Sequence, residues 1–187
     1  MDKSNFLYKN FSHKNNSPPV ISIISKKNSG KTTFIIKLIP ELKKRGYRVG
    51  TLKHDTHGFD IDHEGKDTYK HKQAGSDIVA ISSPWKISVI KDVSEELSID
   101  RLVQEYFMDV DIVITEGYKR AGKPQIEIFR SSAHKFPFYK KGEPCPLIAM
   151  ASDISIDMDD VPIYDINDIM GIADLIEKTF LKDSRVD

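Results

Sequence analysis

A strand-like run, a small polar turn and a helix-like run follow one another at residues 20–42, and this order constrains the chain most. Residues 20–24 are apolar and β-branched except for Ser22, and residues 34, 35, 38, 39 and 42 are apolar at helical spacing. Between them, residues 25–32 read SKKNSGKT, which matches the phosphate-loop pattern G-x-x-x-x-G-K-[ST] except at Ser25. We therefore predict a loop that binds the phosphates of a nucleotide.

The chemistry of a triphosphate explains the residue types in this loop. Small residues such as Ser29 and Gly30 let the chain curl until several backbone N–H groups point inward. The helix that follows directs the positive end of its dipole at the anion. Lys31 is expected to reach the β- and γ-phosphates, and the Thr32 hydroxyl is expected to ligate Mg²⁺.

Ser25 leaves two possibilities open for the start of the loop. If the first position of the pattern demands a positive φ angle, a residue other than glycine costs about 1–2 kcal/mol there. If the strand end keeps a negative φ angle, that cost vanishes.

A second strand should supply the acid on the magnesium side of the nucleotide. Proteins with this loop carry that carboxylate at the carboxyl end of a neighbouring strand. The predicted strand at residues 110–116 ends in Glu116, and Gly117 frees the backbone to turn. We predict that Thr32 and Glu116 hold Mg²⁺ and that Lys31 and Glu116 are catalytic. The alternative is a structural acid at Glu116 that only forms a salt bridge.

Polar residues crowd the loop after the predicted strand at residues 47–54. Ligands of open α/β sheets gather beyond the carboxyl ends of the strands, so a second anionic ligand or a water molecule is expected here. A solvated polar loop is one alternative, and a zinc site is another, although the spacing fits no common zinc pattern. The residues predicted for this second-ligand loop are Lys53, His54, Asp55, His57 and, from the turn after Glu116, Lys119.

The residue that recognises the base is harder to assign. The N-K-x-D motif of common GTPases is absent from the chain. Asp153 follows the predicted strand at residues 146–152, where its carboxylate could accept hydrogen bonds from guanine N1 and N2. Because any aspartate at a strand end would look the same, the choice between GTP and ATP stays open at this point.

Strand and helix patterns alternate along the chain, which is typical of an α/β fold. We predict a P-loop NTPase-type, mostly parallel sheet with helices on both faces, formed by a single nucleotide-binding domain at residues 20–187. Residues 77–82 and 86–92 are predicted to form a hairpin, and residues 1–19 a flexible leader. Further helices are predicted at residues 66–75, 98–107 and 165–180.

Composition excludes several other classes of protein. The 28 basic and 28 acidic side chains cancel, so the chain lacks the basic footprint of a dedicated nucleic-acid binder. No apolar run approaches the roughly 18 residues of a membrane span. The one cysteine, Cys145, cannot form an internal disulfide, which favours the cytoplasm. We expect neither nucleic acid nor membrane as a partner.

Several motifs, taken in order, resemble the MobB family, the molybdopterin-guanine dinucleotide biosynthesis protein B group. They are SGKTT, LIPELKKRG, GTLKHDTHGFDIDHEGKDTYKHKQAG, DIVITEGYK and the closing ASD…DINDIMGIADLIE. The resemblance spans about residues 20 to 182. The block after the second strand and the EGYK motif are more specific than the phosphate loop, which many unrelated proteins share.

The resemblance implies a GTP-binding protein that acts beside the guanylyltransferase attaching GMP to molybdopterin. It also implies a homodimer with an extended sheet, and GTP hydrolysis that is weak or depends on a partner. Carried onto matching positions, it places the magnesium-side acid at Glu116. The phosphate-loop roles fall to Asn28, Ser29, Gly30, Lys31, Thr32 and Thr33.

Two other functions are compatible with the same loop. A small-molecule kinase would close a lid over the phosphates, and residues 131–144 are long enough for one, although they carry lysines rather than arginines. An interaction module would hold nucleotide without hydrolysing it. Rapid hydrolysis needs an extra cation, for which Arg120 and Arg130 are the nearest candidates in the sequence.

Overall fold

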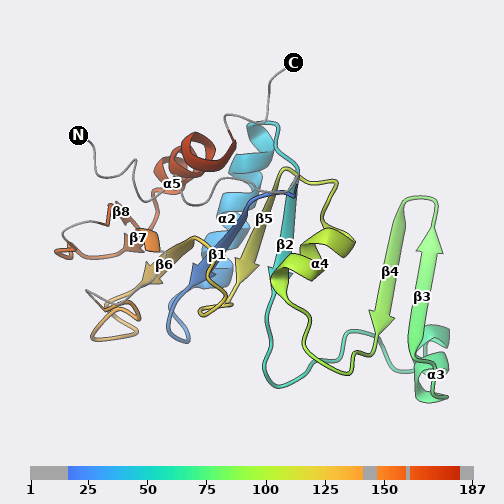
Figure 1. The fold of residues 1–187 in the computed structure, drawn as a ribbon. Coiled ribbons are helices and arrows are strands. Elements are labelled where there is room, and N and C mark those ends of the chain that lie inside the picture. The colour runs from blue at the N-terminus through green and yellow to red at the C-terminus, as the bar shows by residue number, and fades with distance from the viewer. Residues whose placement is uncertain (1–16, 141–146, 159–160, 182–187) are drawn as a thin grey trace. The chain divides into compact units, whose positions relative to one another are not determined.

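The structure is a computed structural model and describes residues 17–140, 147–158 and 161–181, so most of the predicted leader and Cys145 lie outside it. The chain divides into two compact units (Figure 1). The first runs up to His54 and resumes at Ile99, and the second is Asp55–Ser98. The sequence predicts a single domain over residues 20–187, which stays a prediction; the two strands within residues 55–98 pair with each other and not with the main sheet.

A six-stranded sheet with the order β2-β5-β1-β6-β7-β8 forms the first unit, and every pairing in it is parallel. The short strand β8 is absent from the sequence predictions because three residues are too few to give a pattern. The strands are β1 (Val20–Ile24), β2 (Val49–Lys53), β5 (Ile112–Glu116), β6 (Gln125–Phe129), β7 (Leu147–Ser152) and β8 (Ile163–Asp165). The helices are α2 (Lys31–Lys44), α4 (Ile99–Tyr106), α5 (Ile169–Ile176) and the π-helix η2 (Glu177–Leu181).

Helices cover both faces of this sheet, as predicted. Side chains of α2, α5 and η2 pack with Ile112 and Ile114 of β5 in the largest core cluster. Val113 of β5 points to the other face, where it packs with Ile99 and Val103 of α4. Successive residues of a strand point to opposite faces, so the alternation along β5 places these helices on opposite sides.

The second unit consists of α3 (Asp67–Gln73) and an antiparallel hairpin of β3 (Ile78–Ser83) and β4 (Lys86–Lys91), shown in green in Figure 1. This confirms the predicted short helix and hairpin. Helix α3 packs against β3. Among the described residues, no helix is long and apolar enough to cross a membrane.

Candidate phosphate-binding site

The loop between β1 and α2 takes the compact form that its small residues predict. Asn28 and Gly30 have positive φ angles of 65° and 93°. Asn28 and Tyr118 are the only non-glycine residues with positive φ in the part of the chain that the structure describes, so Ser25 does not have one. The second of the two open possibilities for Ser25 therefore holds, and a glycine is not needed at the first position of this loop.

Lys31 lies against its own loop. Its Nζ donates to Ser25 Oγ at 2.9 Å, while Ser25 Oγ donates to the carbonyl of Lys26 at 2.6 Å. The buried hydroxyl of Ser29 donates to the same carbonyl at 3.2 Å. No side chain caps the N-terminus of α2, so its first-turn N–H groups are available to an anion.

Thr32 and Glu116 meet beside this loop. Glu116 is the last residue of β5, which pairs directly with β1, and Thr32 Oγ1 donates to Glu116 Oε1 at 2.8 Å. A hydroxyl and a carboxylate are hard oxygen ligands that suit Mg²⁺ together with phosphate oxygens, so these residues fit the predicted metal. Glu116 forms no ion pair with any residue in the described ranges, as the structural alternative would require.

The turn after Glu116 brings part of the second-ligand loop to the same edge of the sheet. Lys53 pairs with Glu116 in register, and the N–H of His54 donates to the Glu116 carbonyl at 3.1 Å. Gly117 and Tyr118 both have positive φ angles, 101° and 55°. The Tyr118 ring then stacks on His54, with ring centroids 4.5 Å apart and an angle of 25° between the planes.

Asp55 and His57 belong to the second unit. There the N–H of His57 donates to Asp55 Oδ1 at 2.8 Å, which forms a local turn. Their place beside a second ligand stays a prediction.

Lys119 lies close to the phosphate loop, where Lys26 and Lys31 are. Its Nζ lies 4.4 Å from the centroid of the Phe138 ring. Burial lowers the pKa of Lys119, and the nearby charges of Lys31 and Lys26 lower it further, while Glu127 opposes them. The positive charges of Lys26, Lys31 and Lys119 repel one another, so these three lysines together are suited to bind an anion.

Glu127 is a buried acid that the sequence analysis did not single out. It lies in β6, and its two carboxylate oxygens accept hydrogen bonds from the backbone N–H groups of Phe138 and Tyr139. Burial raises the pKa of Glu127, and these N–H groups, with Lys26 and Lys119, oppose the rise. A glutamate within the otherwise apolar run IEIF was the available signal.

Asp153, predicted to recognise the base, contacts a neighbouring turn. Its Oδ1 accepts from the backbone N–H of Ser131 at 2.7 Å, and its Oδ2 accepts from the Ser131 hydroxyl at 3.1 Å. Asp153 thus fixes the chain just after β6. Its contact with guanine stays a prediction.

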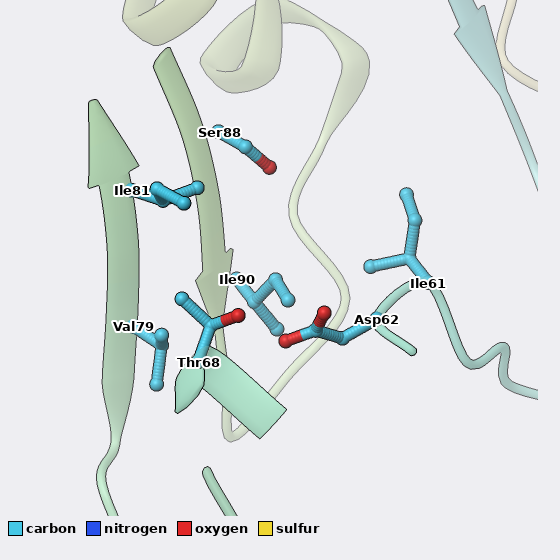
Figure 2. Close-up of a pocket in the computed structure, with 7 residues that line it drawn as sticks. All are labelled: Ile61, Asp62, Thr68, Val79, Ile81, Ser88 and Ile90. Atoms are coloured by element: carbon cyan, nitrogen blue, oxygen red, sulfur yellow. The ribbon is translucent and has the colours of Figure 1, made fainter. Parts of the chain in front are cut away.

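The acidic and histidine-rich loop of the second unit offers no metal cluster. No group of three potential ligands is found among the described residues. Instead, a small hollow lies between this loop, α3 and the hairpin (Figure 2), and Figure 2 shows the Asp62 carboxylate turned toward Thr68 and Ile90. Asp62 Oδ2 is buried and accepts no hydrogen bond from the described part of the chain. The lining residues are Ile61, Asp62, Thr68, Val79, Ile81, Ser88 and Ile90.

Comparison with known proteins gives consistent matches over most of the chain. The family model described as molybdopterin guanine dinucleotide synthesis protein B (MobB) matches residues 20–153. A molybdopterin-guanine dinucleotide biosynthesis adapter protein of Haemophilus influenzae is 35% identical over 164 residues, which cover 87% of this chain and 90% of the relative. The Escherichia coli protein of that description is 36% identical over 163 residues, covering 84% and 91%. The crystal structure of a molybdopterin-guanine biosynthesis protein B matches with a TM-score of 0.66 and 30% identity, covering 85% of this chain and 97% of that one.

Proposed function

The chain belongs to the MobB family, and on that premise we propose that it is a GTP-binding adapter in molybdenum cofactor biosynthesis. Its relatives are adapters of molybdopterin-guanine dinucleotide biosynthesis by name. In this proposal the protein binds GTP with Mg²⁺ and assists the guanylyltransferase that joins GMP to molybdopterin.

The contact between Thr32 and Glu116 beside Lys31 carries this proposal. It brings a hydroxyl, a carboxylate and an ammonium group to one turn, and these are the groups that a magnesium–triphosphate needs. The loop amides and the dipole of α2 add a site for the phosphates themselves. Mg²⁺, when bound, neutralises charge on the phosphate oxygens, and the residues suited to hold it are Thr32 and Glu116.

Slow hydrolysis is consistent with the same residues. In this proposal Lys31 and Glu116 stabilise charge and position the metal, and neither side chain is assigned the role of a general base. Any GTPase activity would accordingly be weak or stimulated by the partner enzyme.

The kinase alternative gains no support from residues 131–140. This segment is bound to the phosphate loop, because Lys26 Nζ donates to the Phe136 carbonyl at 2.8 Å and His134 Nε2 lies 2.6 Å from the Lys27 carbonyl oxygen. A lid would need to move freely over the phosphates. Residues 141–144 of the predicted lid lie outside the described residues.

Homodimer formation is part of the proposal, and the hairpin of the second unit is the surface we assign to it. One face of the hairpin carries Ile78, Ile87 and Val89, which are 53%, 69% and 44% exposed. Branched apolar side chains gathered on one exposed face of a strand pair are suited to pack against the same face of a second copy of the hairpin. The cytoplasm is the expected location, on the strength of the single cysteine.

Nucleotide binding by Lys31→Ala tests the proposal. The wild type should bind GTP with Mg²⁺ more tightly than ATP, and Lys31→Ala should lose nearly all binding. Lys44→Ala removes the same charge at the other end of α2 and should leave the affinity unchanged. Equal affinity for GTP and ATP would remove the guanine preference, and a Lys31→Ala variant that binds like the wild type would remove the site.

A further inference from the structure

Arg130 lies next to the phosphate loop. It directly follows β6, which pairs with β1 on the side away from β5. A Cβ atom built on Gly30 would lie 3.8 Å from Arg130 Nη2 and 4.0 Å from its Nε. The guanidinium group therefore lies alongside Gly30, the residue from which the first turn of α2 starts.

The guanidinium group of Arg130 has no hydrogen-bond or ion-pair partner among the described residues. Arg45 and Arg101, in contrast, each form an ion pair with at least one carboxylate at 2.9 Å or closer. Arg130 is partly buried, and a partly buried cation is unfavourable unless an anion accompanies it. The planar fork of a guanidinium group matches the oxygen atoms of a phosphate group.

The backbone around Arg130 is fixed on both sides. Its carbonyl accepts hydrogen bonds from the N–H groups of Ala133 and His134, both at 3.1 Å. Ser131 is bound to Asp153, and the His134 ring contacts the phosphate loop at the Lys27 carbonyl. Because this turn is already ordered, a ligand at Arg130 would meet a small cost for ordering the backbone.

From these observations we infer that Arg130 binds the phosphate groups of the nucleotide, on the side of β1 opposite the magnesium ligands. The inference rests on the proposed function, which places a nucleotide on this loop. Glu116 approaches from β5 and Arg130 from β6, so the phosphate tail lies between the metal ligands and the guanidinium group. Arg130 therefore contributes to phosphate affinity without affecting the requirement for Mg²⁺.

Displacement of a fluorescent GTP analogue from the full-length chain tests this inference, with GTP and inorganic tripolyphosphate as competitors. Arg130→Ala should weaken both competitors by the same factor, about 10- to 100-fold for a lost charge-assisted contact. Arg130→Lys should recover part of the loss, since it keeps the charge but not the fork. Arg48→Ala, at the amino end of β2 and beside Asp111, is the matched control and should bind like the wild type.

Three results would overturn the inference. Unchanged binding of both competitors by Arg130→Ala, in a protein whose Lys31→Ala variant has lost that binding, would remove Arg130 from the site and leave the proposed function standing. A loss confined to GTP, or a wild type that binds GTP but not tripolyphosphate, would mean that the binding energy lies on the base. A wild type that binds neither would overturn the proposed function as well. If Arg130→Ala has a lowered unfolding midpoint, Arg130→Lys decides, because it too should bind both competitors more weakly than the wild type.

Discussion

Lys31 Nζ donates a hydrogen bond to Ser25 Oγ at 2.9 Å. Ser25, which stands where the usual phosphate-loop pattern has glycine, therefore contacts the lysine of that pattern. Ser25 is fully buried and is not among the residues with positive φ. The departure from glycine is therefore accommodated by the backbone, and the hydroxyl group gains a contact that glycine could not make.

A glycine at position 25 should destabilise the protein. Glycine loses more conformational entropy on folding, so Ser25→Gly should be less stable than Ser25→Ala by about 0.5–1 kcal/mol. The two variants lack the same hydroxyl group, and the difference between them isolates the backbone. Urea unfolding measures it, and a Ser25→Gly variant more stable than Ser25→Ala would mean that this position needs a positive φ angle.

Glu116→Gln should weaken the effect of Mg²⁺ on GTP binding. The carboxylate is hydrogen-bonded to Thr32, and loss of such a ligand or its support costs roughly 10- to 100-fold in metal affinity. Magnesium titrations at fixed GTP concentration give the measurement. Asp111→Asn, next to the amino end of the same strand, is the matched control and should titrate like the wild type. An unaltered magnesium requirement in Glu116→Gln would contradict the assigned role.

Glu127 should make the stability depend on pH in a definite direction. Burial raises its pKa above the ordinary 4.5, so the protonated form is favoured in the folded state. Its contribution to the free energy of unfolding is complete below that ordinary pKa and is lost as the pH rises through the folded-state pKa. The free energy of unfolding of the wild type, minus that of Glu127→Gln, should accordingly decrease from acid toward neutral pH. Urea unfolding at a series of pH values checks this, and a difference that grows with pH would show that the carboxylate is favoured instead.

Ile87→Lys should convert the proposed homodimer to a monomer. In the dimer, a lysine at this position would be buried in the contact between the two hairpins without an acid to pair with. In the single chain, Ile87 is 69% exposed, so a lysine there should be tolerated. Sedimentation velocity distinguishes the two states. Ile36→Lys, a similarly exposed site (63%) on α2, is the control and should leave the dimer intact. A wild type that sediments as a monomer at high concentration would contradict the dimer itself.

Sequence patterns predicted those parts of the fold whose structure is determined by residues close together in the chain. The loop after β1, the hairpin and the helix at residues 67–73 are set by local spacing and turn residues, and all three are confirmed. Strand β8 has only three residues, and whether residues 55–98 join the main sheet depends on strand pairing. Neither could be predicted from local patterns.

The same distinction separates the site residues. Thr32 and Glu116 could be paired in advance because a known arrangement links that loop to the end of a second strand. The positions of Arg130 and Glu127 depend on β6 lying next to β1, although about a hundred residues separate the two strands. Asp153 looked like a base-binding residue from its strand end alone, and its contact with Ser131 appears only once β6 and β7 are paired.

Trp85, between β3 and β4, is 94% exposed and is the one tryptophan of the chain. Its indole emission therefore comes from the tip of the hairpin alone and should lie at the long wavelengths of a ring in contact with water. Any molecule that covers the tip should shift the emission toward shorter wavelengths, so the native protein carries its own optical reporter of association.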